Sequence, residues 1–500
     1  FDCELKADEV NCIDVLILGA GMAGLGAATS LRDSGLSFII LEGQQRVGGR
    51  IHTTNMLKFS QSDEFSANCR IDSGAQWLHG RQNYLHEIAA KHQLVRPELS
   101  EEALGRYVRD DGLIIDKLFV RKIDFKIGQI LEECEKFASE KERKFPESIG
   151  EFLENKFEKI IENFDNKEKV IARQLLDWHI RFQIIDNSCV SMNDVSAKDW
   201  GKYSFNGEDC QAHINLYSGF QPLLDILADD VGINKVIFDK EVVRIDWNNE
   251  NDKVRVKCAD DTVYEAKHVI CTFSIGVLRE RINELFTPQL PNVYKQCIDD
   301  IGFGTINKIF LQFEEKWWGE INGGIQLLWR DDEYTNSDWC RYLSGFDELY
   351  PGIENTLLGW VGGEGALEME SLSDESIVKQ CLSVLETFTG RKVPEPINYF
   401  CTRWNSNKFA RGSYSYTSKQ CDFTNSSPEL LSRPLTKYDL NDLQKNMKNL
   451  NLNGQQITSE IIHKPLIMFA GEACHSSYFS TVHGAFLSGR DQANKLKAIN

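Results

Sequence analysis

Three glycines and one acidic residue near the start of the chain have the spacing of a dinucleotide-binding turn. The pattern G-x-G-x-x-G is formed by Gly19, Gly21 and Gly24. The first glycine permits a tight turn, the second lets the backbone approach a pyrophosphate, and the third lets a helix pack closely on a strand. Glu42 follows about 20 residues later and can accept both hydroxyls of an adenosine ribose. Its carboxylate repels a 2′-phosphate, which favours FAD or NAD over NADP.

The segments around this motif have the pattern of a βαβ unit. The apolar residues 15–18 predict a buried parallel strand, residues 22–31 a helix, and residues 38–41 a second buried strand. The helix amino terminus offers amide donors and partial positive charge to a phosphate. We interpret the unit as a dinucleotide-binding site, and a structural βαβ unit without a ligand is the alternative.

Two further segments combine glycine or other small residues with polar or aromatic side chains. Residues 48–50 read Gly-Gly-Arg, which can bring backbone amides and the Arg50 guanidinium to a phosphate or a flavin edge. A glycine turn with a surface arginine is the alternative. Residues 71–80 mix small residues, which permit close approach to a flat ligand, with Trp77 and His79. A structural histidine is the alternative for His79.

Near the carboxyl terminus, a strand and a helix repeat the arrangement of the first motif. The apolar residues 466–470 precede Gly471 and Glu472, and a helix begins near residue 482. This helix amino terminus could hold the other end of a long dinucleotide.

Lys308 and two tyrosines are the remaining candidates. Lys308 is flanked by apolar residues in a predicted strand, so it lies either at a strand end in water or buried. Tyr414 and Tyr416 are two residues apart in an extended segment, which places both on one face. Ordinary packing is the alternative for this pair.

Composition limits the classes of function. Five hundred residues suit two domains or three small ones. The net charge of −19 argues against binding nucleic acid through its phosphates. An acidic surface attracts cationic ligands, but it is more often simply a soluble surface. No apolar run approaches the length of a membrane span. None of the 14 cysteines forms a C-x-x-C pair, so no metal site is predicted, and disulfides and buried free thiols both stay open. The terminal residues do not form a peroxisomal signal, and a cytoplasmic and a secreted location both stay open.

The order of helical and strand patterns predicts how the chain is divided. Residues 116–185 are helical and highly charged, with a capping box at Ser148 and Glu151. Strand patterns return at residues 235–245 and 254–272 as a β-meander that ends in a buried strand. A meander of this kind commonly accompanies a nucleotide-binding sheet, so we expect the first domain to be discontinuous.

Taken together, these motifs resemble the flavin amine oxidases, in the polyamine oxidase branch that includes spermine and N1-acetylpolyamine oxidases. The resemblance spans nearly the whole chain and ends in the segment 478–485, Tyr-Phe-Ser-Thr-Val-His-Gly-Ala. It implies FAD as the cofactor and an α/β fold with a discontinuous Rossmann-like FAD-binding domain. The second domain is an α+β substrate domain with a mixed sheet and helices. The expected FAD-binding domain comprises residues 1–96, 235–291 and 440–500, and the substrate domain comprises residues 97–234 and 292–439.

The resemblance also implies roles for individual residues. Lys308 matches a catalytic lysine that binds a water at flavin N5, and His79 matches a histidine that binds or helps deprotonate the substrate amine. The implied substrate-binding positions are Tyr414, Tyr416, Ser480, Lys202 and Ile306. The implied cofactor-binding residues are Gly19, Ala20, Gly21, Met22, Ala23, Gly24, Glu42, Gly43, Gly49, Arg50, Gly74, Ala75, Gln76, Trp77, Val242, Trp404, Gly471, Glu472, Thr481 and Val482.

Two positions depart from the pattern of the acetylpolyamine oxidases. That group has an acid where this chain has Lys202, and an asparagine where it has Ile306. Both changes remove groups expected to face a polyamine, and a cation at position 202 can repel one.

The resemblance implies FAD-dependent oxidation of a polyamine. Hydride passes to flavin N5, the imine hydrolyses to an aldehyde and an amine, and O2 reoxidises the flavin to yield H2O2. The expected partners are a small cationic amine and O2, with no nucleic acid, and the chain is expected to be a monomer or a homodimer. The two departures leave two alternatives open, an FAD-binding protein with lost turnover and an oxidase of another amine.

Overall fold

The first strand, helix and second strand of the chain form the predicted βαβ unit. In the computed structural model, β1 (Ile13–Leu18) leads into α1 (Met22–Leu31), and β2 (Phe38–Leu41) pairs with β1 in parallel. The bounds of α1 and β2 agree with those predicted from the sequence. The structure describes residues 13–56, 70–140, 144, 147–203, 212–248, 253–319, 323–330, 338–349, 351–439 and 464–499.

The chain divides into two compact units, which we call unit 1 and unit 2. Unit 1 is assembled from Phe1–Gly49, Leu224–Asp299 and Ser426–Asn500, and unit 2 from Arg50–Leu223 and Asp300–Asn425. Each unit therefore combines segments that are far apart in the sequence. The two domains expected from the sequence are defined by the ligand that each would bind, FAD or the substrate. Their boundaries stay a prediction.

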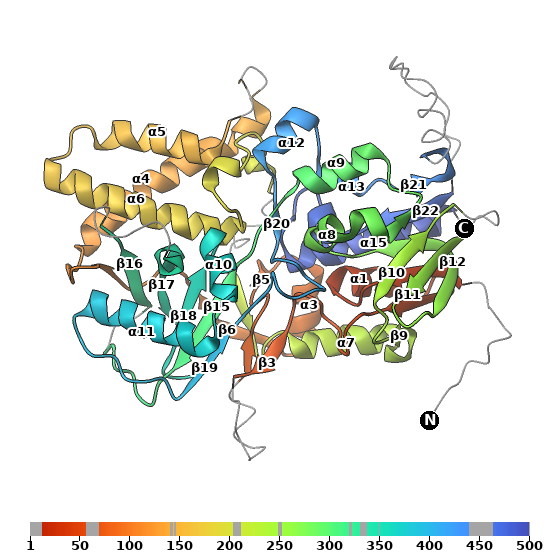
Figure 1. The fold of residues 1–500 in the computed structure, drawn as a ribbon, viewed down its shortest axis with the longest axis horizontal. Coiled ribbons are helices and arrows are strands. Elements are labelled where there is room, and N and C mark those ends of the chain that lie inside the picture. The colour runs from red at the N-terminus through yellow and green to blue at the C-terminus, as the bar shows by residue number, and fades with distance from the viewer. Residues whose placement is uncertain are drawn as a thin grey trace. The chain divides into compact units, whose positions relative to one another are not determined.

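Unit 1 is built around a mainly parallel sheet that has nine strands among the described residues. The strand order is β13-β10-β11-β12-β1-β2-β9, with β22 beside β12 and β21 beside β22. The long strand β12 pairs in parallel with β1 and β22 and antiparallel with β11, so it joins the nucleotide-binding strands to the meander. α1 and α15 pack against each other (Figure 1).

The other elements of unit 1 are α7 (Gln221–Val231, which begins in unit 2), η4 (Ile233–Lys235), β9 (Val236–Ile237), β10 (Val242–Asp246), β11 (Val254–Cys258), β12 (Val263–Cys271), α8 (Ile275–Leu285), β13 (Phe286–Thr287), α9 (Asn292–Asp300), α13 (Pro428–Leu431), β21 (Leu435–Thr436), β22 (Pro465–Phe469), η6 (Glu472–Cys474) and α15 (Val482–Ile499).

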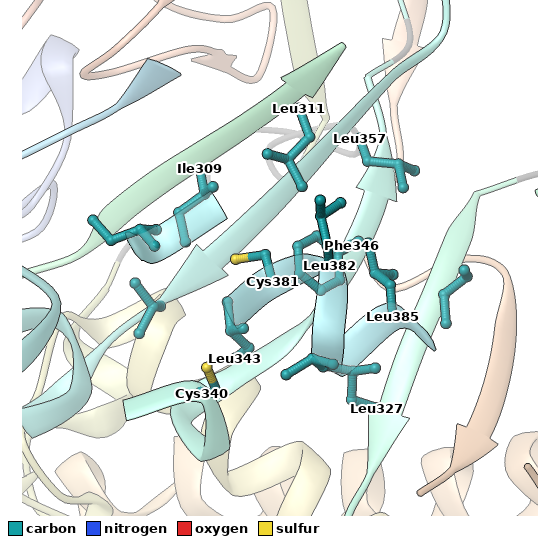
Figure 2. Packing of buried hydrophobic residues seen from close by; sticks show 14 of the residues in the cluster. Ile309, Leu311, Leu327, Cys340, Leu343, Phe346, Leu357, Cys381, Leu382 and Leu385 are labelled. Atoms are coloured by element: carbon teal, nitrogen blue, oxygen red, sulfur yellow. The ribbon is translucent and has the colours of Figure 1, made fainter. Parts of the chain in front are cut away.

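Unit 2 is built around a mixed sheet of six strands among the described residues. The strand order is β19-β15-β18-β17-β16-β7, in which only β16 and β7 are parallel. Leu382 and Leu385 of α11 pack among side chains of the sheet such as Leu343 and Phe346 (Figure 2). This α+β architecture and the α/β architecture of unit 1 are those predicted from the sequence.

The elements of unit 2 are β3 (Thr53–Asn55), β4 (Arg70–Asp72), β5 (Leu78–His79), α3 (Tyr84–Lys91), β6 (Val95–Ser100), β7 (Arg106–Arg109), α4 (Lys117–Glu135), η1 (Phe137–Ser139), α5 (Ile149–Ile161), α6 (Asn166–Asn187), η2 (Met192–Asp194), η3 (Trp200–Lys202), β8 (His213–Leu216), β14 (Gly302–Phe303), β15 (Asn307–Gln312), β16 (Gly324–Leu328), η5 (Trp339–Tyr342), β17 (Leu343–Glu348), β18 (Thr356–Val361), α10 (Gly363–Glu370), α11 (Asp374–Thr389), β19 (Asn398–Cys401), β20 (Ser415–Tyr416) and α12 (Lys419–Thr424).

The predicted helical segment of unit 2 forms the helices α4, α5 and α6, which pack together (Figure 1). The capping box of α5 is present, because the Ser148 hydroxyl accepts the Glu151 N–H and the Glu151 carboxylate accepts the Ser148 N–H. Trp178 fixes α6 to the sheet by donating its indole N–H to the Ser344 carbonyl at 2.7 Å. Among the described residues, no helix is both long enough and apolar enough to cross a membrane.

The close packing of α1 on β1 generates a stability prediction. A Cβ added at Gly24 would lie 1.9 Å from the Gly19 carbonyl oxygen, so Gly24→Ala forces the backbone apart. We expect it to lower the free energy of unfolding by about 3 kcal/mol, measured by urea denaturation. The matched control is Gly128→Ala within α4, where a Cβ would meet nothing within 4 Å. This control should raise stability by about 1 kcal/mol, because alanine is the better helix former. Equal effects of the two substitutions would contradict the packing argument.

Candidate active site

The turn after β1 has the geometry that the glycine pattern predicts. Gly19 has φ +109°, a conformation that favours glycine. The Gly48 N–H donates to the Ala20 carbonyl at 2.9 Å, and this bond brings the Gly-Gly-Arg segment against the turn. An added Cβ at Gly21 would meet its nearest atoms, in Gly48 and Gly49, only at 3.9 Å, so the backbone there is open to a ligand.

Glu42 lies at the end of β2, directly beside this turn. Its carboxylate accepts the Ala20 N–H at 2.7 Å and the Gln44 N–H at 2.8 Å. Burial raises the pKa of Glu42, and the two amide donors oppose this shift. A carboxylate held in this way can accept the hydroxyls of a ribose, which is the role that the sequence predicts.

The second predicted cofactor segment of unit 1 lies at the amino terminus of α15. Thr481 caps this helix, because its hydroxyl accepts the Gly484 N–H at 3.0 Å. Ser480 adopts φ +65°, and its N–H donates to the buried Glu472 carboxylate at 3.2 Å. Gly471 has φ +157°, and a Cβ there would meet nothing within 4 Å. The helix start and the open backbone at Gly471 both fit a bound dinucleotide.

Lys308 is buried in unit 2, where its ammonium group is surrounded by oxygen acceptors. Its Nζ donates to the Asp72 carbonyl at 2.9 Å, the Gly74 carbonyl at 2.8 Å and the Gln76 side-chain oxygen at 2.9 Å. Burial lowers the pKa of Lys308 to about 7, although Asp72 and Glu102 act in the opposite direction. Of the two interpretations of Lys308, the buried one is therefore confirmed.

A row of aromatic rings connects Lys308 to His79. The Lys308 Nζ lies 4.6 Å from the centroid of the Trp360 ring, and Trp360 contacts Trp77 at 5.9 Å between centroids. Trp77 stacks on His213 at 4.5 Å, and His213 meets the edge of His79 at 5.2 Å. The indole N–H of Trp77 is buried and has no acceptor among the described residues, which fits a polar group supplied by a bound cofactor.

Trp404 is fixed against the same segment that surrounds Lys308. Its indole N–H donates to the Ser73 carbonyl at 3.0 Å. A Cβ added at Gly74 would lie 3.0 Å from the Trp404 ring and 1.9 Å from the Arg50 carbonyl oxygen, so only glycine fits there. The Arg50 guanidinium itself donates to the Ser413 carbonyl at 2.8 Å.

The two predicted tyrosines have different surroundings. The Tyr414 hydroxyl donates to the Ile185 carbonyl at 2.6 Å, and burial raises its pKa. Tyr416 belongs to the hydrophobic core beneath α4, α5 and α6, and its ring fills the space beside Gly302. The packing interpretation describes Tyr416, whereas a contact between either tyrosine and the substrate stays a prediction.

The structure places the two departures from the family pattern in different environments. The Lys202 ammonium forms an ion pair with Asp199 at 2.7 Å, so an acidic neighbour offsets its charge. Ile306 is 4% exposed, and the Ser413 hydroxyl accepts its backbone N–H and donates to its carbonyl.

Sequence reasoning missed three carboxyl side chains of unit 2, of which Glu102 interacts with Lys308 while Asp186 and Asp347 interact with Glu102. Burial raises the pKa of Glu102 to about 8, and repulsion from Asp186 and Asp347 adds to this shift. Burial also raises the pKa of Asp186 to about 6 and that of Asp347 to about 7. Asp186 is nevertheless exposed and Glu102 is 20% exposed, so water reaches both despite the dense surroundings. Such groups ionise more readily beside a cation or a hydrogen-bond donor.

The structure also describes the remaining predicted cofactor residues. Met22 and Ala23 are buried at the start of α1, and Gly43 follows Glu42. Ala75 donates its N–H to the Arg50 carbonyl at 3.3 Å. Val242 lies in β10, with its carbonyl accepting from the Arg281 guanidinium at 3.1 Å.

Besides the carboxyl groups, sequence reasoning missed His213 and Trp360. No local pattern marks either residue, since only tertiary contacts bring them to Trp77. The ten cysteines among the described residues are buried, while Cys3, Cys12, Cys69 and Cys210 lie outside the described residues.

Comparison with known proteins identifies the family. Residues 22–497 match the family described as flavin containing amine oxidoreductase. The chain is 30% identical over 522 residues to the peroxisomal N(1)-acetyl-spermine/spermidine oxidase of Bos taurus, which covers 97% of this chain and 94% of that protein. It is also 30% identical over 523 residues to the Homo sapiens protein of the same name, covering 97% and 95%.

Solved structures agree at the level of the fold. Cyclohexylamine oxidase from Brevibacterium oxydans IH-35A superposes with a TM-score of 0.69 at 17% identity, covering 98% of this chain and 99% of that chain. Wild-type putrescine oxidase bound to putrescine gives a TM-score of 0.66 at 21% identity, covering 97% and 99%. This chain therefore belongs to the flavin containing amine oxidoreductase family and is an FAD-dependent amine oxidase.

Proposed function

We propose that this chain oxidises a polyamine of the spermine, N1-acetylspermine or spermidine type. The observation that carries the proposal is the group of carboxyl side chains Glu102, Asp186 and Asp347 in the unit that holds Lys308. Their raised pKa values mean that each is harder to ionise than an exposed carboxyl group, and a nearby cation lowers this cost. A ligand with several ammonium groups supplies such cations, whereas a monoamine supplies one. The names of the two mammalian relatives point to the same substrates.

Lys202 does not oppose this proposal, despite its sign. Its ion pair with Asp199 at 2.7 Å leaves little net charge to repel a polyamine. The acid that the acetylpolyamine oxidases have at this position is absent, so we assign the attraction of cations to Glu102, Asp186 and Asp347 instead.

The residues present fit FAD as the cofactor. In unit 1, the glycine turn, Glu42 and the amino terminus of α15 would hold the dinucleotide. In unit 2, we assign the contact with the flavin ring to Trp404 and Lys308. Bound FAD supplies the hydride acceptor at N5, and its reoxidation by O2 yields H2O2.

The amine must be neutral to lose hydride, because a protonated nitrogen has no free lone pair. We assign to His79 the binding or deprotonation of the substrate amine. The imine that the substrate becomes is then hydrolysed to an aldehyde and an amine.

As long as Lys308 keeps its three oxygen acceptors, it can bind a water in only one of its two protonation states. As an ammonium, its three N–H donors are all used by Asp72, Gly74 and Gln76. As a neutral amine it keeps two donors and gains a lone pair, which can accept a hydrogen bond from water. The pKa of about 7 makes both states accessible near neutral pH.

One alternative to the proposal is an oxidase of another amine, which would fit the same fold, and one experiment separates the two. The test is H2O2 production with spermine, N1-acetylspermine, spermidine, putrescine and cyclohexylamine. The proposal predicts that spermine, N1-acetylspermine or spermidine is turned over at a lower concentration than cyclohexylamine. Turnover of cyclohexylamine alone, or of none, would overturn it.

Replacing Lys308 tests its role at the flavin. We expect Lys308→Met to slow flavin reduction or reoxidation by about 100-fold, because the group that holds the water is lost. FAD should stay bound, as measured by flavin absorbance of the purified protein. The control is Lys316→Met, which removes an ion pair with Glu348 and leaves the lysine cage intact. Wild-type kinetics in Lys308→Met would refute the assigned role.

Neutralising Glu102 tests the attraction of cations. We expect Glu102→Gln to raise the polyamine concentration for half-maximal flavin reduction about tenfold, equivalent to about 1.4 kcal/mol. Because the pKa of Glu102 is about 8, wild-type affinity should increase as the pH rises from 6.5 to 8.5 and the carboxylate forms. This increase should be smaller in Glu102→Gln. The matched control is Glu101→Gln, at the neighbouring exposed residue. The same affinities and pH dependence in the two variants would contradict the assignment.

A further inference from the structure

Strand β15 carries a buried polar residue, Asn307, next to Lys308. Successive side chains of a strand point to opposite faces, so Asn307 faces away from the lysine cage. Asn307 is fully buried, at 0% exposed, and none of the roles proposed above uses it.

Every hydrogen-bonding site of the Asn307 amide is used. Its side-chain oxygen accepts the backbone N–H of Trp404 at 3.1 Å and the Thr402 hydroxyl at 2.9 Å. Its amino group donates to the Ala366 carbonyl at 3.2 Å and to the Glu370 carboxylate at 2.9 Å. Two donors and two acceptors are thus matched, and only one orientation of the amide allows this.

Glu370, at the end of α10, accepts hydrogen bonds from the residues that follow Trp404. One oxygen of its carboxylate accepts the Asn405 N–H at 2.8 Å, as well as the Asn307 amino group. The other oxygen accepts the Ser406 N–H at 2.7 Å and the Ser406 hydroxyl. Hydrogen bonds to an ionised acceptor are among the stronger ones, so the start of this loop is firmly held.

The other end of Trp404 is held from the lysine side. Its indole N–H donates to the Ser73 carbonyl, which lies between the two carbonyls that accept from Lys308. A closed path of hydrogen bonds therefore runs from Asn307 to Trp404 and from Trp404 to residues 72–74. From these residues it returns to Lys308, which is adjacent to Asn307 in the strand. Trp404 is held at its backbone by Asn307 and at its indole ring by Ser73.

We propose that Asn307 and Glu370 are positioning residues that set the plane of Trp404 against the flavin. The inference rests on the proposed contact between Trp404 and the flavin ring. Small misplacements of groups at a reacting centre are costly, of the order of 100-fold in rate for about 1 Å. A loosened Trp404 should therefore reduce the rate of flavin reduction more than the affinity for the amine.

The test replaces Glu370 by glutamine, which keeps its shape but removes the charge and one acceptor. We expect Glu370→Gln to change the visible circular dichroism of bound FAD and to lower the rate constant of anaerobic flavin reduction about tenfold. The amine concentration at half-saturation should change less than about twofold. The matched control is Glu368→Gln, an exposed position on the same helix, which should leave both signals unchanged. An unchanged flavin spectrum and rate in Glu370→Gln would overturn the proposal.

A double-mutant cycle separates positioning from a general loss of stability. If Glu370 acts through Trp404, adding Glu370→Gln to Trp404→Phe should lower the rate by much less than the same change does in the wild type. Multiplicative effects would overturn the proposal. If Glu370→Gln does not fold, Ser406→Ala removes one hydroxyl donor to the same carboxylate. A flavin spectrum shifted by Ser406→Ala supports the proposal, and an unshifted one overturns it.

The flavin spectrum also separates this inference from the proposed substrate. Circular dichroism requires only bound FAD, so it is informative even if no polyamine reduces the flavin. Failure of every polyamine would overturn the proposed function alone. An unshifted spectrum in the positioning variants would overturn the inference alone.

Discussion

The buried ammonium group of Lys308 is the constraint on which the site in unit 2 depends. A lysine inside a protein is costly unless its donors are satisfied, and here three oxygens of residues 72–76 satisfy them. The backbone of this segment must therefore turn its carbonyls inward at Asp72 and Gly74. Position 74 must also be glycine, because a side chain there would collide with Arg50 and Trp404.

The two faces of β15 carry different polar residues of the site. One face presents Lys308 to residues 72–76, and the other presents Asn307 to Trp404 and α10. The sheet that carries this strand is held by a large apolar core, in which α11 packs among strands β15 to β18 (Figure 2). A rigid strand of this kind can keep two polar groups in fixed register, which a loop could not do.

A feature could be predicted from the sequence when the residues that form it are close together in the chain. The βαβ unit, the α5 capping box and the start of α15 were predictable because each is formed by residues close in the chain. Burial of Lys308 stayed one of two alternatives, because its acceptors lie more than 200 residues away. Glu102, Asp186 and Asp347 could not be found at all, since only the folded chain brings their charges within range.

The most direct test of the account is the pH dependence of anaerobic flavin reduction at saturating amine, in the wild type and in Lys308→Met. The account predicts a rise in the wild-type rate with a midpoint near pH 7, the pKa of Lys308. This step should stay in place when the amine is exchanged for one of different pKa, and it should be absent from Lys308→Met. The same step in both proteins would contradict the central claim that the neutral form of this caged lysine takes part in the chemistry at the flavin.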